Sequence, residues 1–316
     1  MATFAATNAV TITTASNFIP ELWSEEVLAA YKANLVMEQL VTILDFHGEK
    51  GDIVHIPRPT RGSVSTKTAV TQVTLIAESN TSFDLTISTH YEYSRLIEDI
   101  AKIQAMDTMR QFYTDDAGYA LAIQVDTDIA ALGVGFAASA STPTTAGTAY
   151  DEAVIGSDGS TQWTDNGSGN GASFTDAGIR RVIQYLDASN VPSRNRALVV
   201  SEVEKRKLLG LPRFTENAFV GEAGGANSIR NGLIGNVYGV PVYVTTNTGT
   251  DDANDSTTYD MCLMFQKEAC VFADRLSPRS QTQYKQEFLA DLFTVDQIYG
   301  TGLMRPEAGV AIAVPQ

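Results

Sequence analysis

A long run of helical periodicity between residues 107 and 132 constrains the fold of this 316-residue chain more than any other feature. Its apolar residues recur at the three- and four-residue spacing of one helix face: Met109, Phe112, Tyr113, Ala117, Ala120, Leu121 and Ile123. Asp107 suits the N-cap position, and no proline lies between Pro59 and Pro143. The pattern predicts one helix of roughly 39 Å, at about 1.5 Å per residue. Such a helix indicates an elongated molecule with a backbone strut; a long core helix of an ordinary globular enzyme is the alternative.

Composition indicates a soluble protein with a sizeable core. The chain is 44% apolar, which is enough for two domains. It has no apolar run long enough to span a bilayer, and its N-terminus lacks the basic-then-apolar pattern of a signal peptide, so we expect a soluble protein made in a cytoplasm. Cys262 and Cys270 flank an expected hairpin turn near Lys267 without lying opposite each other, which predicts free thiols in a reducing compartment.

The net charge of −15 argues against sequence-independent binding to nucleic acid, which needs a basic surface. This charge is unevenly distributed along the chain. Residues 111–179 hold nine acidic side chains and no Lys or Arg, whereas residues 45–76 hold four basic and three acidic side chains. We expect attraction between these two parts in neighbouring copies of the chain. The alternative to such attraction is that these charges are solvated and keep the protein soluble.

The N-terminal part of the chain predicts an arm, a helix and a projecting loop. Residues 1–16 are rich in Ala, Thr and Asn without a clear period, which favours a flexible or extended arm, and a helix follows from about Pro20. Residues 45–82 begin with a short apolar alternation, and Pro57 and Pro59 then exclude a central strand. Since few large apolar residues follow, we expect a projecting hairpin loop.

Three further segments surround the long helix. Strict alternation predicts a strand over residues 82–94, and residues 95–106 predict a short helix that leads into the long one. After it, residues 133–173 form a tract of Gly, Ser, Thr and Ala with the composition of a linker or surface excursion.

A second domain is expected from Thr175, which suits the N-cap of an amphipathic helix. A buried strand is expected over residues 197–201, and Ser201 with Glu204 predicts a capping box for the next helix. Helix, strand, helix and further strands indicate a mixed α/β domain. The Gly-rich piece at 219–232 lacks the strand, helix and GK[ST] ending of a phosphate loop.

The run NGLIGNVYGVPVYVTTNT at residues 231–248 is the most specific in the chain. Its glycines, Gly232, Gly235 and Gly239, punctuate short β segments, and Pro241 opens a strand. Here the sequence resembles the major capsid proteins of tailed bacteriophages with the Hong Kong 97-type fold, many of which carry a similar run around the capsomer axis. Four other pieces resemble this family in the same order: FIPELWSEEVLAAYKANLVMEQLV, GDIVHIPRP, YALAIQVDTDIAAL and DQIYGTGLMRPEAGVAIAV.

The resemblance implies an α+β fold of the Hong Kong 97 type, with an N-terminal arm, an extended β-hairpin loop, a long spine helix, a peripheral domain and an axial domain. The implied segments are the arm and first helix (1–44), extended loop (45–82), peripheral strand and spine helix (83–133), Gly/Ser/Thr-rich insertion (134–173), axial α/β domain (174–280) and closing strands of the peripheral domain (281–316). The insertion matches no part of the family pattern.

The implied function is that of a major capsid protein, which self-assembles into the icosahedral shell around a tailed-phage genome. Implied partners are further copies in hexamers and pentamers, scaffolding and portal proteins and a decoration protein, with DNA enclosed but not bound sequence-specifically and no membrane. The implied location is the virion, after assembly in the bacterial host cytoplasm. The alternatives are an encapsulin-type nanocompartment shell, or a glycan-active enzyme.

Enzymatic chemistry has little support in the sequence. No G-x-S-x-G, H-E-x-x-H or Cys/His constellation occurs, and His47, His55 and His90 fit ordinary packed or exposed positions. Neighbouring carboxylates on the long helix point in different directions. The acidic loop at 248–260 lacks the turn glycine and final glutamate of an EF-hand. We therefore expect no catalytic residue, no cofactor and no metal.

Candidate residues for contacts between subunits lie on the extended loop and the first helix. They are Arg58, Arg61, Lys67 and Trp23. Some members of the family cross-link their shells through an isopeptide bond between a loop lysine and an asparagine of the peripheral domain. The loop offers Lys50 and Lys67, but no asparagine follows Asn254, so we expect a shell held by non-covalent contacts.

Overall fold

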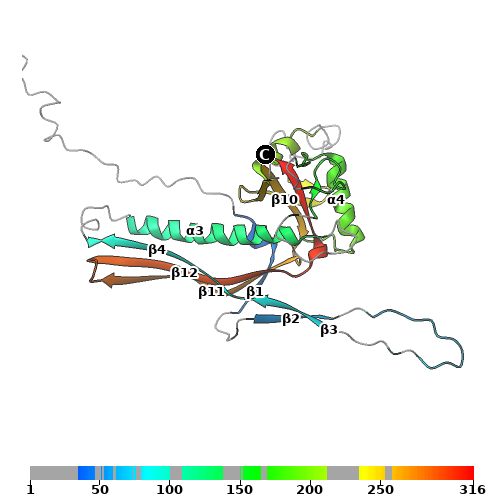
Figure 1. Cartoon of the computed structure of the whole chain (residues 1–316), viewed down its shortest axis with the longest axis horizontal. Helices are drawn as coiled ribbons and strands as arrows, with labels where there is room; N and C mark the ends of the chain where they lie inside the picture. Colours follow the sequence, from blue (N-terminus) through cyan, green and yellow to red (C-terminus); the bar gives the residue numbers. More distant parts are fainter. Residues whose placement is uncertain are drawn as a thin grey trace, which may run out of the picture.

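The computed structural model describes residues 35–46, 51, 53–59, 62–73, 75, 80–99, 109–137, 150, 152–164, 169–211, 235–252 and 258–316. A long helix lies along a long sheet, a compact domain sits at one end of both, and a two-stranded hairpin projects below that domain (Figure 1). The molecule is therefore elongated, as the long helical pattern predicts.

The long helix α3 spans Met109–Ala131 and continues as a short 3-10 helix, η3, over Leu132–Gly135. At 23 residues it is about 35 Å long. Ala117 and Leu121 pack against Phe293 and Val295 of the sheet, which buries the predicted apolar face there, whereas Ala120 is exposed. The predicted helix is confirmed over 109–131, and Asp107 lies outside the described residues.

The long sheet has four strands in the order β1-β11-β12-β4. Their bounds are Thr42–Asp45 for β1, Thr89–Glu98 for β4, Cys270–Lys285 for β11 and Ala290–Leu303 for β12. Strand β4 includes residues 95–98, where the sequence predicted the start of a helix. This prediction is wrong for those residues because all four pair with β12, from Phe293 back to Ala290.

The projecting hairpin consists of β2, Ile53–Pro59, and β3, Asn80–Thr86, paired antiparallel. Residues 62–73 between them have no regular structure, as expected for an extended loop. The predicted strand over 82–94 is divided, because β3 pairs with β2 whereas β4 pairs with β12. Leu85 and Ile87 anchor the base of the hairpin on Val271 and Ala273 of β11.

The compact domain is built on a seven-stranded sheet with the path β5-β13-β10-β6-β8-β7, and β9 pairs with β10 beside it. The strands are β5 Val154–Ile155, β6 Arg196–Val200, β7 Asn236–Val237, β8 Val240–Val244, β9 Gly249–Asp252, β10 Thr258–Gln266 and β13 Gly309–Pro315. Its helices are α4, Asp176–Ala188, and α5, Glu202–Leu208; α1, Met37–Leu40, contacts α3, and η4, Pro306–Ala308, precedes β13.

The sheet of this domain is buried on both faces. Alternate residues of β10 divide between two cores: Cys262 and Met264 pack with α4, whereas Leu263 and Phe265 pack towards Ile129 of α3. The second core joins the compact domain to the helix and to the long sheet. The C-terminal half of α3 is therefore part of the domain's interior and fixes its position.

Local signals placed the elements of this domain correctly. The side chain of Thr175 accepts a hydrogen bond from the Gly178 amide at 3.1 Å, and Ser201 accepts one from the Glu204 amide at 3.4 Å. The carboxylate of Glu204 does not complete a capping box with Ser201; it accepts from the Phe174 amide at 3.0 Å. Both predicted N-caps are confirmed.

The glycine-punctuated run forms a tight hairpin. Strands β7 and β8 are joined by Tyr238 and Gly239, which both have positive φ, +50° and +82°. Positive φ at both central residues is the geometry of a type I′ turn, which suits a hairpin and favours Gly at its second position. The turn therefore accounts for Gly239, while Gly232 lies outside the described residues.

The implied segment boundaries differ from the sheets at two places. Strand β13 belongs to the compact domain, not to the long sheet, so the implied closing segment 281–316 divides between them. Its residues from Val310 to Val314 are buried throughout, which suits an internal strand. The implied insertion 134–173 contributes β5 and the buried side chains of Ala153 and Trp163, so its described part belongs to the core.

The predicted hairpin around Lys267 is also wrong. Strands β10 and β11 follow each other closely in sequence but enter different sheets, because β10 pairs with β6 and β13 whereas β11 pairs with β12. Cys262 and Cys270 are buried free thiols. Burial raises the pKa of Cys270 to about 12, which leaves it unreactive near neutral pH.

Candidate functional site

The loop between β2 and β3 carries apolar side chains that the subunit itself does not cover. Val64 and Val70 are fully exposed, and Val73 and Leu75 retain 60% and 86% of their exposure. Lys67 lies on the same exposed loop. Scattered exposed apolar residues are ordinary, but four within twelve positions of one projecting segment indicate a contact surface.

Arg58, at the end of β2, is held by a residue of its own subunit. Its Nη2 lies 3.5 Å from Oε1 of Glu307, and both side chains are about two-fifths exposed. The pair joins the hairpin to η4 of the compact domain, beside a groove of about 580 Å³ lined in part by Ile56, Pro192 and Met304. Arg58 was predicted to contact a neighbouring subunit; Glu307 is its partner within the chain. Arg61 and Trp23 lie outside the described residues.

Phenol groups of the long sheet bind carboxylates of the spine helix. The hydroxyl of Tyr299 donates to Asp128 at 2.7 Å and that of Tyr91 donates to the same oxygen at 3.1 Å. Further along, Tyr93 donates to Asp116 at 2.9 Å. Burial, and then the Asp128 carboxylate, raise the pKa of Tyr299. These bonds fix the rotation and register of α3 on the sheet.

Asp126 fixes the place where the N-terminal part of the chain meets the spine helix. Its buried Oδ1 accepts from the backbone amides of Met37 and Val36, at 2.7 and 3.2 Å, and Oδ2 accepts from Asn247 at 3.4 Å. Burial raises the pKa of Asp126, and the amides of Met37 and Val36 and the side chain of Asn247 oppose that shift. The side chain therefore ties residues 36–37, α3 and the compact domain together.

These contacts bear on the predicted attraction between the acidic tract 111–179 and a neighbour. Asp116, Asp126 and Asp128 form hydrogen bonds within the subunit. Asp158 accepts from the Ser160 and Thr161 amides of its own turn at 2.8 and 2.9 Å. At least these four acids have structural roles, which the charge count along the sequence did not reveal.

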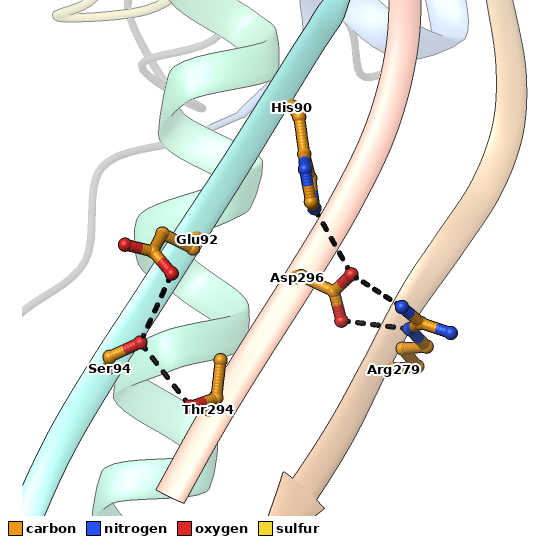
Figure 2. A network of polar contacts seen from close by, with 6 residues as sticks. All are labelled: His90, Glu92, Ser94, Arg279, Thr294 and Asp296. Carbon is orange, nitrogen blue, oxygen red and sulfur yellow. Dashed lines mark hydrogen bonds and ion pairs between the residues drawn. The ribbon is translucent and has the colours of Figure 1, made fainter.

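A polar network joins three strands of the long sheet on the face away from α3 (Figure 2). The carboxylate of Asp296 on β12 accepts from Nε and Nη2 of Arg279 on β11, at 2.9 and 3.0 Å. Nε2 of His90 on β4 lies 3.1 Å from Oδ2 of the same Asp296 carboxylate. The Arg279 guanidinium, and then His90, hold the pKa of Asp296 below its usual range. The bidentate geometry makes this network a structural cross-link.

The position of the network has a local reason. Strand β11 shifts register twice, between Asp274 and Leu276 and again before Arg279. Regular pairing with β12 resumes at Arg279, opposite Asp296. The ion pair therefore holds the strands together where the irregular stretch ends.

Within the described ranges, no group of three or more His, Cys, Asp or Glu side chains is placed to hold a metal ion. None of the helices in that part of the chain is long and apolar enough to cross a membrane.

Comparison with solved structures shows what this architecture is similar to. The fold matches a structure from Mycobacterium phage Che8 with a TM-score of 0.71 at 24% identity, over 94% of this chain and 97% of that one. It matches the capsid of cyanophage P-SCSP1u (TM-score 0.70, 18% identity) over 98% and 96%, and the mature capsid of bacteriophage PhiM1 (0.69, 12%) over 94% and 92%. No family model and no curated protein matches the sequence. The chain has the Hong Kong 97-type capsid fold.

Proposed function

We propose that this chain is the major capsid protein of a tailed bacteriophage and assembles into the icosahedral shell that encloses the genome. The observation that carries the proposal is the match to phage capsid structures over nearly the whole length of both chains.

The surface of the subunit supports this role. The 62–73 loop, which carries exposed valines, projects away from the rest of the subunit (Figure 1), and an isolated monomer gains nothing from that arrangement. In a shell each loop lies on a neighbour, and symmetry repeats the contact in every copy. Apolar area of this kind then leaves water at about 25 cal/mol per Å².

The partners of such a subunit are chiefly further copies of itself, in hexamers and pentamers. Scaffolding and portal proteins, and a decoration protein, complete the proposed set. The net charge of −15 fits a shell that surrounds DNA without binding it by sequence. The proposed location is the virion, with assembly in the host cytoplasm and no enzymatic activity.

Expression of the full chain, alone and with the products of its neighbouring genes, tests the proposal. Negative-stain electron microscopy and sedimentation are expected to reveal closed particles, rings or sheets. Particles recovered from lysed host cells and filled with double-stranded DNA support a phage shell. A protein cargo inside them supports the encapsulin alternative, and a small monomer under every condition contradicts both.

A further inference from the structure

A groove of about 310 Å³ lies where the C-terminal end of α3 meets β9 of the compact domain, and we call it the α3–β9 groove. Its lining consists of Thr127, Ala130, Ala131 and Val134 from the helix end, Asn247 to Asp251 from β9 and the turn before it, and Tyr150. Asp251 is the one charged residue of this lining, and no lining residue is basic. The groove therefore has a negative charge that none of its own residues neutralises.

Tyr150 brings a polar group without a partner to this groove. Its side chain is only 6% exposed, and its hydroxyl lies against Gly249, where an added Cβ would clash with it. Within the described ranges, the hydroxyl forms no hydrogen bond. Burial, and then the Asp251 carboxylate, raise the pKa of Tyr150 to about 12, so the hydroxyl keeps its proton at neutral pH. Because a polar group this deeply buried usually has a partner, the site is completed by a ligand that supplies one.

The groove suits the ammonium group of a lysine side chain. The C-terminal end of a helix carries partial negative charge, and the last turn of α3 contains no basic residue to balance it. The carboxylate of Asp251 and the phenol oxygen of Tyr150 add two further acceptors. An ammonium group has three N–H donors, and the aliphatic part of a lysine can pack on Ala130 and Ala131.

The α3–β9 groove and the projecting hairpin belong to opposite faces of the long sheet. Alternate residues of β11 point to these two faces: Phe272 packs in the core that contains Ile129 of α3, whereas Val271 and Ala273 pack against the base of the hairpin. Figure 1 shows α3 and the hairpin on different sides of the sheet. A loop that rests on a neighbour from the hairpin side would have to cross the layer of subunits to reach the groove. A ligand for the groove therefore comes from a molecule on the α3 side.

We propose that the α3–β9 groove binds a lysine side chain of a separate, basic protein that covers the α3 side of the shell. The proposal rests on the proposed shell function, in which a scaffolding or decoration protein binds many copies of the subunit. Each copy carries a net charge of −15, so a basic partner is complementary to every copy, whereas another copy of the chain is not. The groove gives this general attraction a defined point of contact.

Disulfide exchange with two small probes tests the preference of the groove for an ammonium group. Ala131→Cys places a thiol on the exposed last residue of α3, beside the groove. The new thiolate attacks cystamine or bis(2-hydroxyethyl) disulfide, forms a mixed disulfide and releases one thiol of the probe. The attached arm then ends in an ammonium or in a hydroxyl group. With both probes and their reduced forms at equal concentrations, intact mass spectrometry measures the ratio of the two adducts at equilibrium, which does not depend on the reactivity of the thiol.

The matched control is Ala120→Cys, because Ala120 is also an exposed alanine of α3 but does not line the groove. The native cysteines are buried and do not interfere. In unassembled subunits, the ratio of aminoethyl to hydroxyethyl adduct is expected to be at least fivefold higher at Ala131→Cys than at Ala120→Cys. Equal ratios at the two positions overturn the proposal.

Two substitutions in the groove identify the groups that bind the ammonium. Asp251→Asn or Tyr150→Phe, added to Ala131→Cys, should remove most of the fivefold preference. Asp115→Asn removes the same charge from another part of α3 and should leave the preference unchanged. If Asp115→Asn lowers the ratio as much as Asp251→Asn does, the preference reflects the charge of the whole surface and the proposal is wrong.

Photo-cross-linking in co-assembled shells tests the source of the lysine. The photoreactive residue p-benzoylphenylalanine replaces Thr250, which is exposed at the groove, in a chain expressed together with the products of its neighbouring genes. Irradiation is expected to join this chain to a separate protein, and mass spectrometry of the digest should place the link beside a lysine. Changing that lysine to glutamine, or adding Asp251→Asn, should lower the yield of the link at least fivefold.

The other outcomes of the cross-linking experiment are equally clear. A link to another copy of this chain overturns the proposal by making a second copy the occupant. Shells that form without any link to a separate protein overturn it as well, and so does a link whose yield is independent of the lysine and of Asp251. If the unmodified chain forms no shells in any combination, the proposed function fails, whereas the preference of the unassembled subunit for the ammonium probe is measured separately.

Discussion

At the scale of single residues, the acidic side chains of the spine helix act chiefly within the subunit. Asp116 and Asp128 accept from tyrosines of the long sheet, and Asp126 accepts from the chain that leads into β1. A helix that carried only its apolar stripe could rotate or slide on the sheet. Directional hydrogen bonds at three points along α3 select one arrangement, which a shell subunit needs if every copy is to present the same surfaces.

The sequence supports part of this picture. The alternation of Tyr91 and Tyr93 correctly predicts a strand with both rings on one side. Asp116 and Asp128 are twelve residues apart on the helix, about three and a third turns, so their spacing alone does not align them along one line of the helix. Neither pattern alone reveals the bonds between them, because their partners are far apart in the chain and meet only through the fold.

A charge swap tests whether Arg58 acts through Glu307. Arg58→Glu places two carboxylates together and should lower the yield of shells more than Arg58→Ala does. Adding Glu307→Arg to Arg58→Glu should restore the yield, because the pair is re-formed within the chain. An exposed pair is worth about 0–1 kcal/mol, so the effect is measured as shell yield, in which each copy repeats it.

The matched control for this swap is Arg305 with Glu268, a pair at 3.6 Å with similar exposure that does not involve the hairpin. Reversal of Arg305 alone should change shell yield little. If the Arg58 and Glu307 double variant stays as impaired as Arg58→Glu, the important partner of Arg58 is an acid of another subunit.

Asp296→Asn should destabilise the unassembled subunit at neutral pH. The pKa of Asp296 is lowered in the folded state, so its stabilising contribution is present above the unfolded value near 3.9 and is lost as the pH falls through the folded value. Because Arg279 and His90 are half-exposed, we expect a loss of about 1 kcal/mol at pH 7. Urea unfolding at pH 7 and at successive values below pH 4 measures it.

Glu92→Gln is the control, since Glu92 lies on the same face and, among the residues that the structure describes, accepts only a long hydrogen bond, from Ser94 at 3.4 Å. Its effect should be smaller at every pH. If the loss of unfolding free energy caused by Asp296→Asn is the same at pH 7 and at every value below pH 4, the network stabilises the subunit through packing and not through the charge of Asp296.

At the scale of elements, local signals and tertiary pairing explain which predictions succeeded. Caps, periodicity and turn residues placed α3, α4, α5 and the β7–β8 hairpin, because each depends on neighbours in sequence. Residues 95–98 and β13 were misplaced because their conformation or sheet is decided by partners almost 200 residues away or in another domain. Pairing of this kind overrides local propensity.

Removal of residues 62–71 should leave the subunit folded and prevent closed shells. Every described residue from 62 to 71 is exposed and lies outside regular structure, so little stability is lost. Circular dichroism and thermal melting of the unassembled subunit should change little, while sedimentation shows no shells. If the deletion variant assembles normally, this loop makes no contact between subunits that assembly needs.

A second pair of variants separates loop length from loop chemistry. Val64→Ser with Val70→Ser keeps the length but removes the exposed apolar groups, and should lower shell yield. Ser63→Ala with Ser65→Ala changes neighbouring positions of the same loop and should not. Equal yields in both variants would show that the valines are not buried in the shell.

At the scale of the whole molecule, the subunit is an elongated frame whose rigid parts meet at one junction. The C-terminal half of α3 packs under the compact domain, the hairpin is anchored on β11 beside it, and Asp126 ties in the chain leading from the arm. The extended loop and the chain that leads from the N-terminal arm are therefore both attached to this rigid junction. Because such a subunit is rigid, the copies bound to it are held at fixed positions relative to one another, as a closed shell requires.

The same frame bears on how mature shells are held together. An isopeptide cross-link requires a lysine with a neutral amine and an asparagine within reach, both shielded from water. Lys67 lies on the exposed loop and Lys50 lies outside the described residues, while no asparagine occurs from residue 255 to the C-terminus, which includes β10 to β13. Non-covalent burial repeated over many copies stabilises such a shell without a covalent bond.

We therefore expect purified mature particles, boiled in detergent with reductant, to run as single chains near 34.0 kDa. The Lys67→Arg variant, which keeps the charge and cannot form the bond, should assemble equally well and resist detergent equally. A ladder of oligomers that survives boiling, is lost in Lys67→Arg, and yields a peptide branched at Lys67 by mass spectrometry would establish a covalent shell with an acceptor other than a C-terminal asparagine.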